Sequence, residues 1–471
     1  MKKLFIAAFL AFGAIASFAS NATVYKYSPD APKSKRYVLT LDSQDCHVYP
    51  TPLADIAPFD IAGKTVAVVK VNEQIKSFDI RPLSKKIVSK LLDDKTLQFE
   101  ISEPCNLSVE INGIGHPLFI FANPPIKNPP KKGDKNVMFF EAGKLHDLGL
   151  RKQLPSNTTV YIEGGAVVYG SFRIGDRETG SQMENVRICG NGIISCEKIP
   201  PAIEKRGPSS QGIEFHNTSN INLEGFCIVQ SPNWTIPMFA CRDVHIDNIK
   251  TVSEIGWDDG IDVVSCKNVL IENCFLRNKD DCIAIKAGVG YAPKYFNHSL
   301  PNNVENVTVR KCVVWNSIWG NGLEIGFETR GDEIKNIVFE DIDIIHTQRN
   351  PKWKEGKEGT FTIHNGDRAK IHNVLYKNIR VEDPENYLID IRIMFSRYSK
   401  DKTRGKVCDI RFEDIYVTTK EPLKNIFEGF SEECSVSGIT LKNVFINGKP
   451  FAESKDISVE IGKYAEIPLV E

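Results

Sequence analysis

Five aspartates are concentrated in one short segment near the middle of the chain. The segment WDDGIDVVSCKNVLIENCFLRNKDDCIAIK places carboxylates at Asp258, Asp259 and Asp262, then at Asp280 and Asp281. Crowded carboxylates repel one another, and the usual reasons to retain them are a bound cation or a shared proton for acid–base work. Inverting hydrolysis of a glycosidic bond needs such a set, because a protonated carboxyl protonates the leaving oxygen and an ionised one activates water, at a separation of roughly 6.5–9.5 Å.

The interval between the two groups of aspartates indicates how they come together. Asp259 and Asp280 are 21 residues apart (280 minus 259), which is close to one turn of a solenoid built from short strands. Equivalent positions on adjacent strands lie about 4.8 Å apart, so their side chains point at one patch. The elements that position them must therefore be stacked strands.

A short motif recurs through most of the chain and supplies those strands. It starts with a polar residue or glycine, continues with an aliphatic residue and then alternates polar and apolar positions. Its closest starts differ by 23 and 25 residues, and wider gaps reach 38. The nine copies are NVRICGNGII from Asn185, NINLEGFCIV from Asn220, DVHIDNIKTV from Asp243, NVLIENCFLR from Asn268, NVTVRKCVVW from Asn306, NIVFEDIDII from Asn336, NVLYKNIRVE from Asn373, DIRFEDIYVT from Asp409 and GITLKNVFIN from Gly438. The pattern predicts an all-β chain, a right-handed parallel β-helix with loops inserted into some coils.

The sixth position of the motif is often Asn or Asp, which tolerate the left-handed bend between stacked strands. These residues are Asn248, Asn273, Asp341, Asn378, Asp414 and Asn443. A β-sandwich of short strands would also alternate, but it would not repeat one motif nine times at a near-constant offset.

The sequence before the repeats lacks the motif and differs in composition and pattern. Residues 1–20 carry two lysines, an apolar run and small residues, typical of a cleaved export signal and too short for a membrane span. We therefore expect a periplasmic or extracellular protein. Residues 21–130 alternate without the repeat and end in a Pro- and Lys-rich stretch, which predicts an N-terminal β-sandwich-like domain and a linker. Residues 131–471 form the predicted β-helix, and we expect the N-terminal domain to cap the end of its stack.

The overall charge and the cysteines narrow the classes of partner. With 59 basic and 60 acidic residues the net charge is -1, so electrostatics gives no reason to dock on nucleic acid or an anionic membrane. Twelve cysteines allow disulfides in an exported chain. Cys274 and Cys312, however, recur at one position of the motif among Ile and Val. We therefore expect these cysteines to be small buried hydrophobic residues, and we expect no disulfide framework.

Four segments resemble glycoside hydrolase family 28, the polygalacturonases. They are SPNWTIP, WDDGID, KDDCIAIK and WGNGLEIG, in the order that this family keeps, and the resemblance covers roughly residues 155–450. It implies the pectin-lyase-like form of the β-helix and an inverting glycoside hydrolase that cleaves an α-linked polysaccharide. It also implies that Asp280 is the general acid and that Asp259 and Asp281 hold the nucleophilic water. We predict no cofactor and no metal ion.

Two departures from that family concern the sugar. Asn321 stands where the histidine of Gly-His-Gly is expected, and asparagine cannot shuttle a proton near neutral pH. Thr362 and His364 stand where Arg-Ile-Lys would supply two cations, and an anionic sugar buried without such a partner is costly. The segments HPLFIFANP, TVYIEGGAVVYGSF and DIIHTQ also resemble glycoside hydrolase family 49, the dextranases and isopullulanases, which act on neutral α-glucans. A neutral or only locally charged α-linked glycan is therefore favoured over plain polygalacturonate.

All five tryptophans lie in one window around the aspartates, where their rings could stack on sugar faces. The window contains Trp234, Trp257, Trp315, Trp319 and Trp353, with the basic residues Lys286, Arg330 and Arg349. Each alone is typical of core filling or of a solvated surface charge, but as a set we expect some of them to face a groove. The predicted substrate-binding residues are Trp234, Trp257, Trp319, Asn321, Lys286, Thr362 and His364.

Two other functions are compatible with the aspartates. In a calcium-dependent β-helix polysaccharide lyase the cluster would hold Ca²⁺ while a base removes the proton beside a uronate; the order of the aspartates and the lack of an obvious arginine base disfavour it. In a non-catalytic glycan-binding β-helix the aspartates would be turn residues only. The choice between internal and terminal cleavage depends on whether loops close the groove, and the insertions at 287–305 and 347–358 are the candidates for blocking one end.

Overall fold

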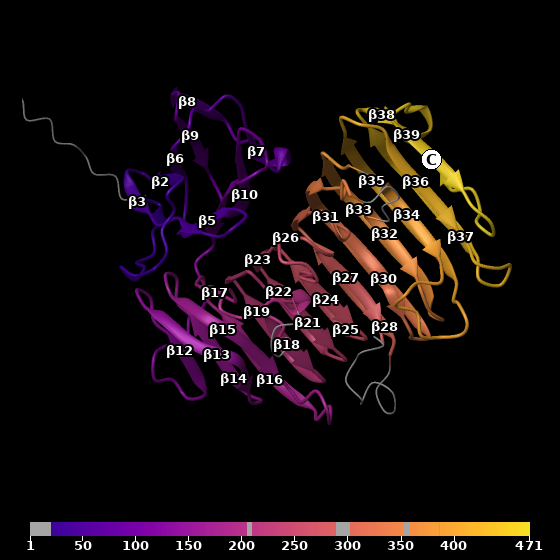
Figure 1. Cartoon of the computed structure of the whole chain (residues 1–471), viewed down its shortest axis with the longest axis horizontal. Helices are drawn as coiled ribbons and strands as arrows, with labels where there is room; N and C mark the ends of the chain where they lie inside the picture. The colour runs from indigo at the N-terminus through magenta and orange to yellow at the C-terminus, as the bar shows by residue number, and fades with distance from the viewer. Residues whose placement is uncertain (1–19, 205–209, 289–301, 353–357, 386) are drawn as a thin grey trace, which may run out of the picture.

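The computed structural model describes residues 20–204, 210–288, 302–352, 358–385 and 387–471. Its strands form one continuous sheet of 29 strands and two smaller sheets near the N-terminus. Apart from one short hairpin near the C-terminus, the strands of the large sheet pair in parallel with their equivalents on the next coil, as β22 (Arg242–Asp247) does with β25 (Lys267–Glu272). The chain is therefore a right-handed parallel β-helix, and the predicted fold class is confirmed (Figure 1).

Each coil contributes strands to three faces. The first, called the site face below, contains β18 (Ile213–His216), β21 (Ile236–Phe239), β24 (Ile261–Val264), β27 (Ile283–Ala287), β30 (Leu323–Thr329), β32 (Gly359–Asn365), β34 (Tyr387–Ile393), β36 (Leu423–Glu428) and β39 (Ile457–Ile461). The second face contains β12 (Val137–Phe140), β14 (Thr158–Ile162), β16 (Met183–Cys189), β19 (Thr218–Glu224), β22, β25, β28 (Val304–Arg310) and β40 (Leu469–Val470). The third face contains β17 (Ile193–Ser195), β20 (Cys227–Val229), β23 (Lys250–Val252), β26 (Phe275–Asn278) and β29 (Val313–Asn316).

Longer strands continue from one face to the next. They are β13 (Leu145–Leu154) and β15 (Val167–Ile174) in the early coils, and β31 (Glu333–Thr347), β33 (Lys370–Glu382), β35 (Val407–Thr418) and β37 (Val436–Ile446) in the later ones. β38 (Lys449–Pro450) forms a hairpin with β37, and the short 3-10 helices are η1 (Leu83–Lys85), η2 (Ala202–Glu204) and η4 (Phe451–Glu453). The described residues contain no helix that is long and apolar enough to cross a membrane.

The bends between coils depend on residues with left-handed backbone. All six Asn and Asp residues predicted at the sixth motif position have φ between 51° and 57°, as expected for side chains that tolerate this region. At the first motif position the side-chain amides bond from coil to coil, with Asn306 Nδ2 donating to Asn268 Oδ1 at 3.1 Å and Asn336 Nδ2 to Asn306 Oδ1 at 2.9 Å. This asparagine ladder satisfies turn polar groups and aligns neighbouring coils.

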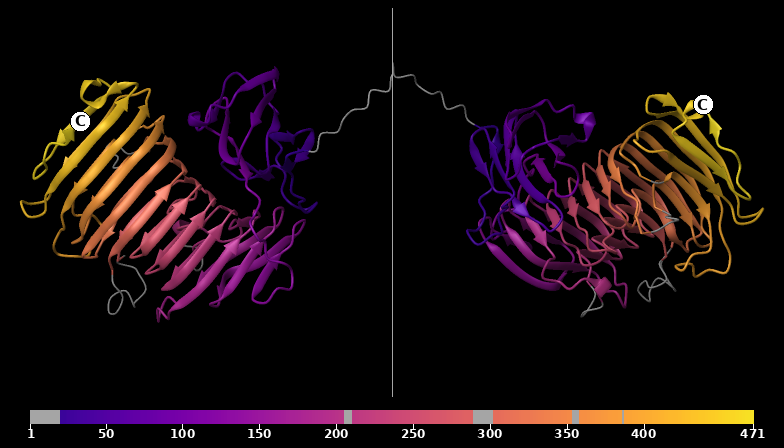
Figure 2. Two further views of the ribbon diagram at one scale, coloured as in Figure 1. Left: turned by 180° about the vertical axis from the view of Figure 1, so that it is seen from behind. Right: turned by 45° about the horizontal axis from the view of Figure 1, so that its top comes forward.

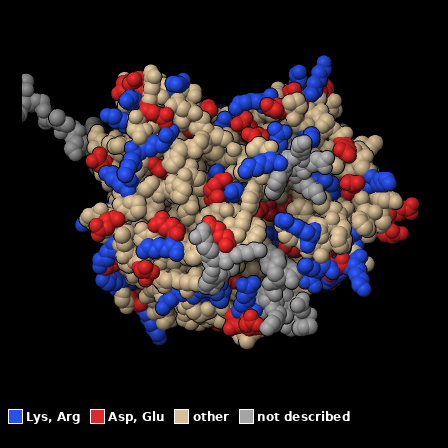
Figure 3. All heavy atoms as spheres, viewed as in Figure 1, with Lys and Arg blue, Asp and Glu red and all other residues tan. Residues whose placement is uncertain are grey.

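Aliphatic and aromatic side chains fill the interior of the coil. Phe339, Tyr376 and Phe412 stack on successive coils with ring centroids 4.9 Å and 4.6 Å apart. Cys274 and Cys312 are buried in this core, as predicted, and all twelve cysteines are free thiols. Acidic and basic side chains are interspersed over the face of the molecule shown in Figure 3.

The N-terminal unit, residues 22–123, consists of two sheets that share one apolar core. One sheet contains β1 (Ala22–Thr23), β4 (Tyr49–Pro50), β5 (Asp55–Ile61), β7 (Phe78–Arg81), β10 (Cys105–Ile111) and β11 (Leu118–Asn123). The other contains β2 (Tyr37–Leu41), β3 (Gln44–Cys46), β6 (Thr65–Val71), β8 (Ser89–Asp93) and β9 (Thr96–Ile101). The arrangement is sandwich-like, as the sequence predicts.

The N-terminal unit lies along the third face of the coil (Figure 2). Phe119 packs on Phe275 with ring centroids 4.8 Å apart and on Trp315 at 5.8 Å, and Phe121 lies 5.2 Å from Phe275. Arg81 Nη1 pairs with Glu382 Oε2 at 2.6 Å. The expectation that this unit caps the end of the stack is therefore wrong: β11 is buried on both sides, and its second apolar side covers the apolar third face.

The predicted segment boundaries stay predictions. Residues 1–19 lie outside the described part of the chain, so the export signal at 1–20 has no structural description apart from its last residue. β11 ends at Asn123 and the first strand of the coil, β12, begins at Val137.

Candidate active site

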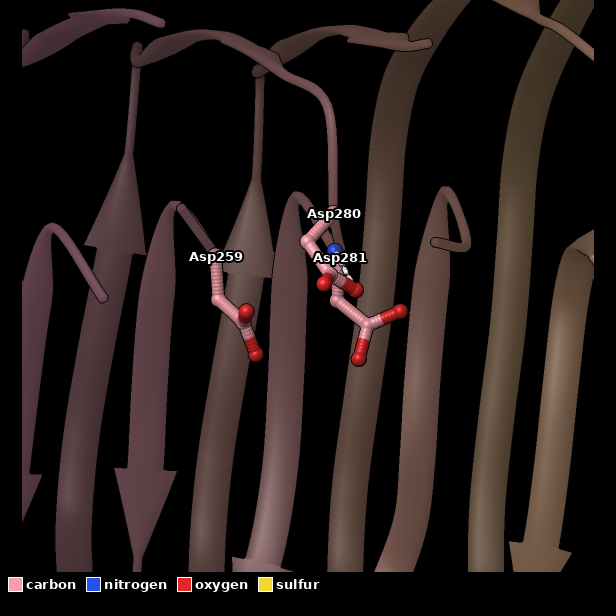
Figure 4. Close-up of side chains that lie close together, drawn as sticks. All are labelled: Asp259, Asp280 and Asp281. Carbon is pink, nitrogen blue, oxygen red and sulfur yellow. Dashed lines mark hydrogen bonds between the residues drawn. The ribbon is translucent and has the colours of Figure 1, made fainter. Parts of the chain in front are cut away.

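The three predicted catalytic aspartates lie together at one edge of the site face (Figure 4). Asp259 belongs to the turn between β23 and β24, and Asp280 and Asp281 belong to the turn between β26 and β27 on the next coil. One carboxylate oxygen of each lies within 4.8 Å of the other two. Asp259 and Asp281 are buried, and Asp280 is partly exposed. These oxygens are close enough to share a proton, a water or a cation.

The Asp258 side chain links the two turns. Its Oδ1 accepts a hydrogen bond from the Asp280 N–H at 3.1 Å, and its Oδ2 accepts one from the Ile255 N–H at 3.1 Å. Its main-chain carbonyl accepts a further bond from Asn278 Nδ2 at 2.7 Å. Asp258 is fully buried, and its hydrogen bonds fix the two turns relative to each other.

The separation of the carboxylates is shorter than the 6.5–9.5 Å expected from the sequence. Asp280 and Asp281 are consecutive and Asp259 occupies the equivalent turn one coil away, and the three side chains converge from these neighbouring turns. Two oxygens about 4.5 Å apart can both accept a hydrogen bond from one water at about 2.8 Å from each. The observed geometry therefore suits a water held between two carboxylates.

Lys286 on β27 supplies the positive charge beside Asp259. Its Nζ lies 2.8 Å from Asp259 Oδ2 and 2.7 Å from Asp262 Oδ1, and its side chain is 4% exposed. The ammonium also lies 3.8 Å from the centroid of the Trp234 ring. Burial holds the pKa of Asp262 well above its usual range, and the charge of Lys286 opposes that rise.

Asn321 holds Asp281. Its main-chain N–H and its Nδ2 donate to Asp281 Oδ1 at 2.8 Å and 2.9 Å, while its Oδ1 accepts from the Gly359 N–H at 2.9 Å. Among the described residues, the Asp280 carboxylate accepts one hydrogen bond, from the Asp281 N–H at 3.2 Å. Burial, and next the charge of Asp259, raise the pKa of both Asp280 and Asp281 well above the usual carboxyl range. The set therefore keeps a proton at pH values where isolated aspartates are ionised.

Three of the tryptophans surround this cluster in different ways. Trp257 directly precedes Asp258 and is 38% exposed, Trp319 is half-buried, and Trp234 lies beneath the Lys286 ammonium with 7% exposure. Trp315 is 1% exposed and packs against the N-terminal unit, so it belongs to the core. Trp353 lies outside the described residues.

The remaining predicted residues have other neighbours. Thr362 and His364 on β32 bind Glu324 on β30. Arg330 Nε lies 3.8 Å from an Asp401 carboxylate oxygen, and the main-chain N–H of Arg349 donates to Glu385. Within the described part of the chain, no hydrogen bond or ion pair joins these arginines to the three aspartates. Residues 289–301 and 353–357 of the two predicted insertions are not described.

Two functional candidates on the site face, Glu324 and Asp390, were not singled out from the sequence. The strand register places Asp262, Ala284, Glu324, Thr362 and Asp390 in one row. The sequence does contain a signal for such residues: a single carboxylate between aliphatic neighbours in an otherwise apolar strand, as in GLEIG and LIDIRI. Such a residue faces away from the coil interior.

Comparison with known families and sequences gives consistent matches. The family described as Glycosyl hydrolases family 28 matches residues 142–462. Endo-polygalacturonase of Pectobacterium carotovorum subsp. carotovorum is 26% identical over 255 residues, which cover 53% of this chain and 55% of the relative. Probable exopolygalacturonase B of Aspergillus fumigatus is 24% identical over 250 residues, 49% of each chain. The chain thus spans about half the length of the curated relatives it matches.

Two solved structures resemble nearly the whole chain. Dex49A from Penicillium minioluteum has a TM-score of 0.69 at 14% identity, over 96% of this chain and 100% of that one. The family 28 exopolygalacturonase of Yersinia enterocolitica has a TM-score of 0.50 at 14% identity, over 94% and 99%. At these identities the likeness shows the fold alone. The resemblances predicted from the sequence are confirmed, the one to family 49 at the level of the fold.

Proposed function

The chain belongs to glycosyl hydrolases family 28, and on that premise we propose that it is an inverting glycoside hydrolase that cleaves an α-linked polysaccharide. The observation that carries the proposal is the convergence of Asp259, Asp280 and Asp281, whose carboxylate oxygens lie within 4.8 Å of one another. Relatives named as endo- and exopolygalacturonases support the class of reaction.

Asp280 acts as the general acid in this proposal. Burial and the charges of Asp259, Asp281 and Asp258 raise its pKa well above the usual carboxyl range. Asn321 donates two hydrogen bonds to Asp281 and the Lys286 ammonium contacts Asp259, whereas the Asp280 carboxylate accepts one bond, from the Asp281 N–H. We therefore assign the shared proton to Asp280, the carboxyl with the fewest hydrogen-bond donors, which gives it to the leaving glycosidic oxygen.

Asp259 and Asp281 hold the nucleophilic water between them. They take up its proton as it attacks the anomeric carbon from the face opposite the leaving group, so the configuration inverts. Lys286 and Asn321 were predicted from the sequence as substrate contacts; here they act as positioning residues. The Lys286 ammonium and Asn321 Nδ2 contact carboxylates, and Asn321 Oδ1 accepts from the Gly359 N–H. Among the described tryptophans, Trp257 offers the most exposed ring for stacking on a sugar.

The test is a panel of α-linked polysaccharides with an isosteric variant. Asp280→Asn should abolish reducing-sugar release from dextran, pullulan, polygalacturonate or rhamnogalacturonan while leaving thermal unfolding unchanged. The matched control is Asp243→Asn, which changes an exposed aspartate of the asparagine ladder and should retain full activity. Release by Asp280→Asn at the wild-type rate would refute the proposal.

Two further readouts separate the alternatives. Proton NMR of the first-formed product reports the anomer, and retention would refute the role of Asp259 and Asp281 as water holders. Three neighbouring carboxylate oxygens could also hold a cation, so activity is measured with chelator. Loss of activity together with an unsaturated product would identify a calcium-dependent lyase instead.

We also propose that residues 1–20 direct export to the periplasm or the exterior, on the basis of their lysines and apolar run. Amino-terminal sequencing of the protein recovered from a secreting host should show cleavage near residue 20. An uncleaved terminus in the cell interior would contradict it.

A further inference from the structure

A second group of polar residues crosses the site face on the C-terminal side of the three aspartates. Glu324 lies on β30, Thr362 and His364 on β32, and Asp390 and Arg392 on β34, in two adjoining rows of the register. Their apolar neighbours along the strands, such as Ile325 and Ile363, point into the coil, so these side chains lie on the site face. We call the five residues the Glu324 cluster.

The contacts within the Glu324 cluster leave each cation bound to a carboxylate. His364 Nδ1 lies 3.0 Å from Glu324 Oε2, and its Nε2 lies 3.3 Å from Asp390 Oδ2. Arg392 Nε donates to Asp390 Oδ1 at 2.6 Å, and the Thr362 hydroxyl donates to Glu324. Glu324, Thr362, His364 and Asp390 are completely buried. The two carboxylates raise the pKa of His364 to about 9 against the effect of burial, so the imidazole is charged at neutral pH.

The cluster is consequently neutral as a whole. Two cations, His364 and Arg392, are balanced by two carboxylates, Glu324 and Asp390. Nearer the scissile position the Lys286 ammonium is likewise bound to Asp259 and Asp262. Each of these cations is thus in contact with a carboxylate, whereas Arg397, an exposed residue on the loop after β34, contacts the hydroxyl and the ring of Tyr398.

We propose that Glu324 and Asp390, by neutralising the cations buried beneath this part of the site face, make it accept a neutral sugar and discriminate against a uronic acid. The inference rests on the proposed hydrolase function and names its substrate class. A uronate placed beside Asp281 and the cluster would add a negative charge to a site whose cations are already neutralised. Such a charge gains no partner and is repelled by the ionised carboxylates. A neutral sugar meets no such cost.

The experiment compares two substrates of equal length, a neutral α-linked oligosaccharide and an oligogalacturonide. The measured quantity is the ratio of kcat/KM for the neutral substrate to kcat/KM for the uronic one, which should be on the order of 100 for the wild type. Glu324→Gln leaves the His364 charge partly uncompensated and should lower the ratio about tenfold. Adding His364→Lys to Glu324→Gln supplies a permanent cation and should lower it further. The matched control, Glu340→Gln on the second face, should leave it unchanged.

Several results would overturn the inference. A wild-type preference for the oligogalacturonide would do so. This includes a preference that disappears in Arg397→Ala and is thereby traced to Arg397, an exposed cation on the loop after β34. An equal shift of the ratio in Glu324→Gln and Glu340→Gln would do so as well. If Glu324→Gln does not fold, as judged by thermal unfolding, Asp390→Asn makes the same test by removing the other neutralising carboxylate.

Failure of the proposed function would be recognised separately. If the wild type cleaves neither oligosaccharide, calorimetric binding of both to the Asp280→Asn protein still measures the preference. Tighter binding of the oligogalacturonide would then overturn the inference. If instead the wild type prefers to cleave the oligogalacturonide and Asp280→Asn abolishes that cleavage, the hydrolase function is retained and the proposed preference for a neutral sugar is rejected.

Discussion

Replacing Lys286 by methionine tests the electrostatic organisation of the site most directly. Methionine keeps much of the length and apolar character of the lysine stem but removes the ammonium that lies 2.8 Å from Asp259 and 2.7 Å from Asp262. The three side chains are at most 4% exposed, so little solvent reaches the carboxylates that remain. Both stability and turnover should fall.

The expected loss of stability at pH 7 is about 3–5 kcal/mol, the usual cost of removing one partner of a buried ion pair. Each contact is worth about 6 kcal/mol in gross Coulomb energy at an effective dielectric constant near 20, and lysine desolvation offsets part of it. The control is Lys267→Met, because the Lys267 side chain is 44% exposed and lies 3.4 Å from a Glu305 oxygen. That exposed pair should contribute less than about 1 kcal/mol.

The loss should also depend on pH. Burial raises the pKa of Asp262, and without Lys286 nothing opposes that rise, so the folded variant binds the proton more tightly than the unfolded chain. A group of this kind stabilises the fold as pH falls through its raised folded pKa. The deficit relative to wild type should therefore be larger at pH 8 than at pH 5 in denaturant titrations. A deficit no larger than that of Lys267→Met, or one equal at both pH values, would refute the role assigned to Lys286.

Three further predictions concern the surrounding residues. Asn321→Ala removes one of two donors to Asp281 and should lower kcat about 10- to 100-fold with little change in KM; an unchanged kcat in steady-state assays would contradict its positioning role. Trp257→Ala should raise KM about tenfold without lowering the melting temperature, because the ring is 38% exposed. Trp315→Ala, whose ring is 1% exposed, should instead cost about 3–5 kcal/mol of stability. Kinetics and denaturation of both proteins check this, and a loss of stability in Trp257→Ala with a raised KM in Trp315→Ala would contradict it. Activity should persist above the ordinary carboxyl range and fall at higher pH, because it needs protonated Asp280, whose pKa is raised; an alkaline limb near pH 4 in the kcat/KM profile would oppose this.

The repeat motif was sufficient to predict the coil because its signals are local. In every copy an alternating segment predicts a strand, and a residue such as Asn273, which tolerates positive φ, predicts the bend that follows it. The approach of Asp259 to Asp280 also followed from the coil length. The carboxylate separation did not, because it depends on consecutive turn residues whose side chains converge.

The partners of Lys286, Glu324 and Asp390 could not be predicted from the sequence. Which side chains meet across the site face depends on strand register, and the loops between copies vary in length, so residues 24 or 40 positions apart become neighbours. The position of the N-terminal unit was missed for a related reason. Phe119 and Phe121 alternate as in any half-buried strand, and only the fold shows that both sides of β11 are covered.

The N-terminal unit has a consequence for the cooperativity of unfolding. In a simple solenoid each coil contacts only its neighbours, so stability is a sum of local terms and the ends can fray independently. Here Asp60 binds Asn191 at 2.7 Å, Asn123 binds Asn248 at 3.2 Å, and Arg81 binds Glu382 at 2.6 Å. These contacts join coils that do not touch one another to a single folded body. Breaking one of these contacts disturbs the others, so the N-terminal unit and the coils that it contacts should unfold as one cooperative unit. Because the contacts join residues far apart in the sequence, folding should be slower.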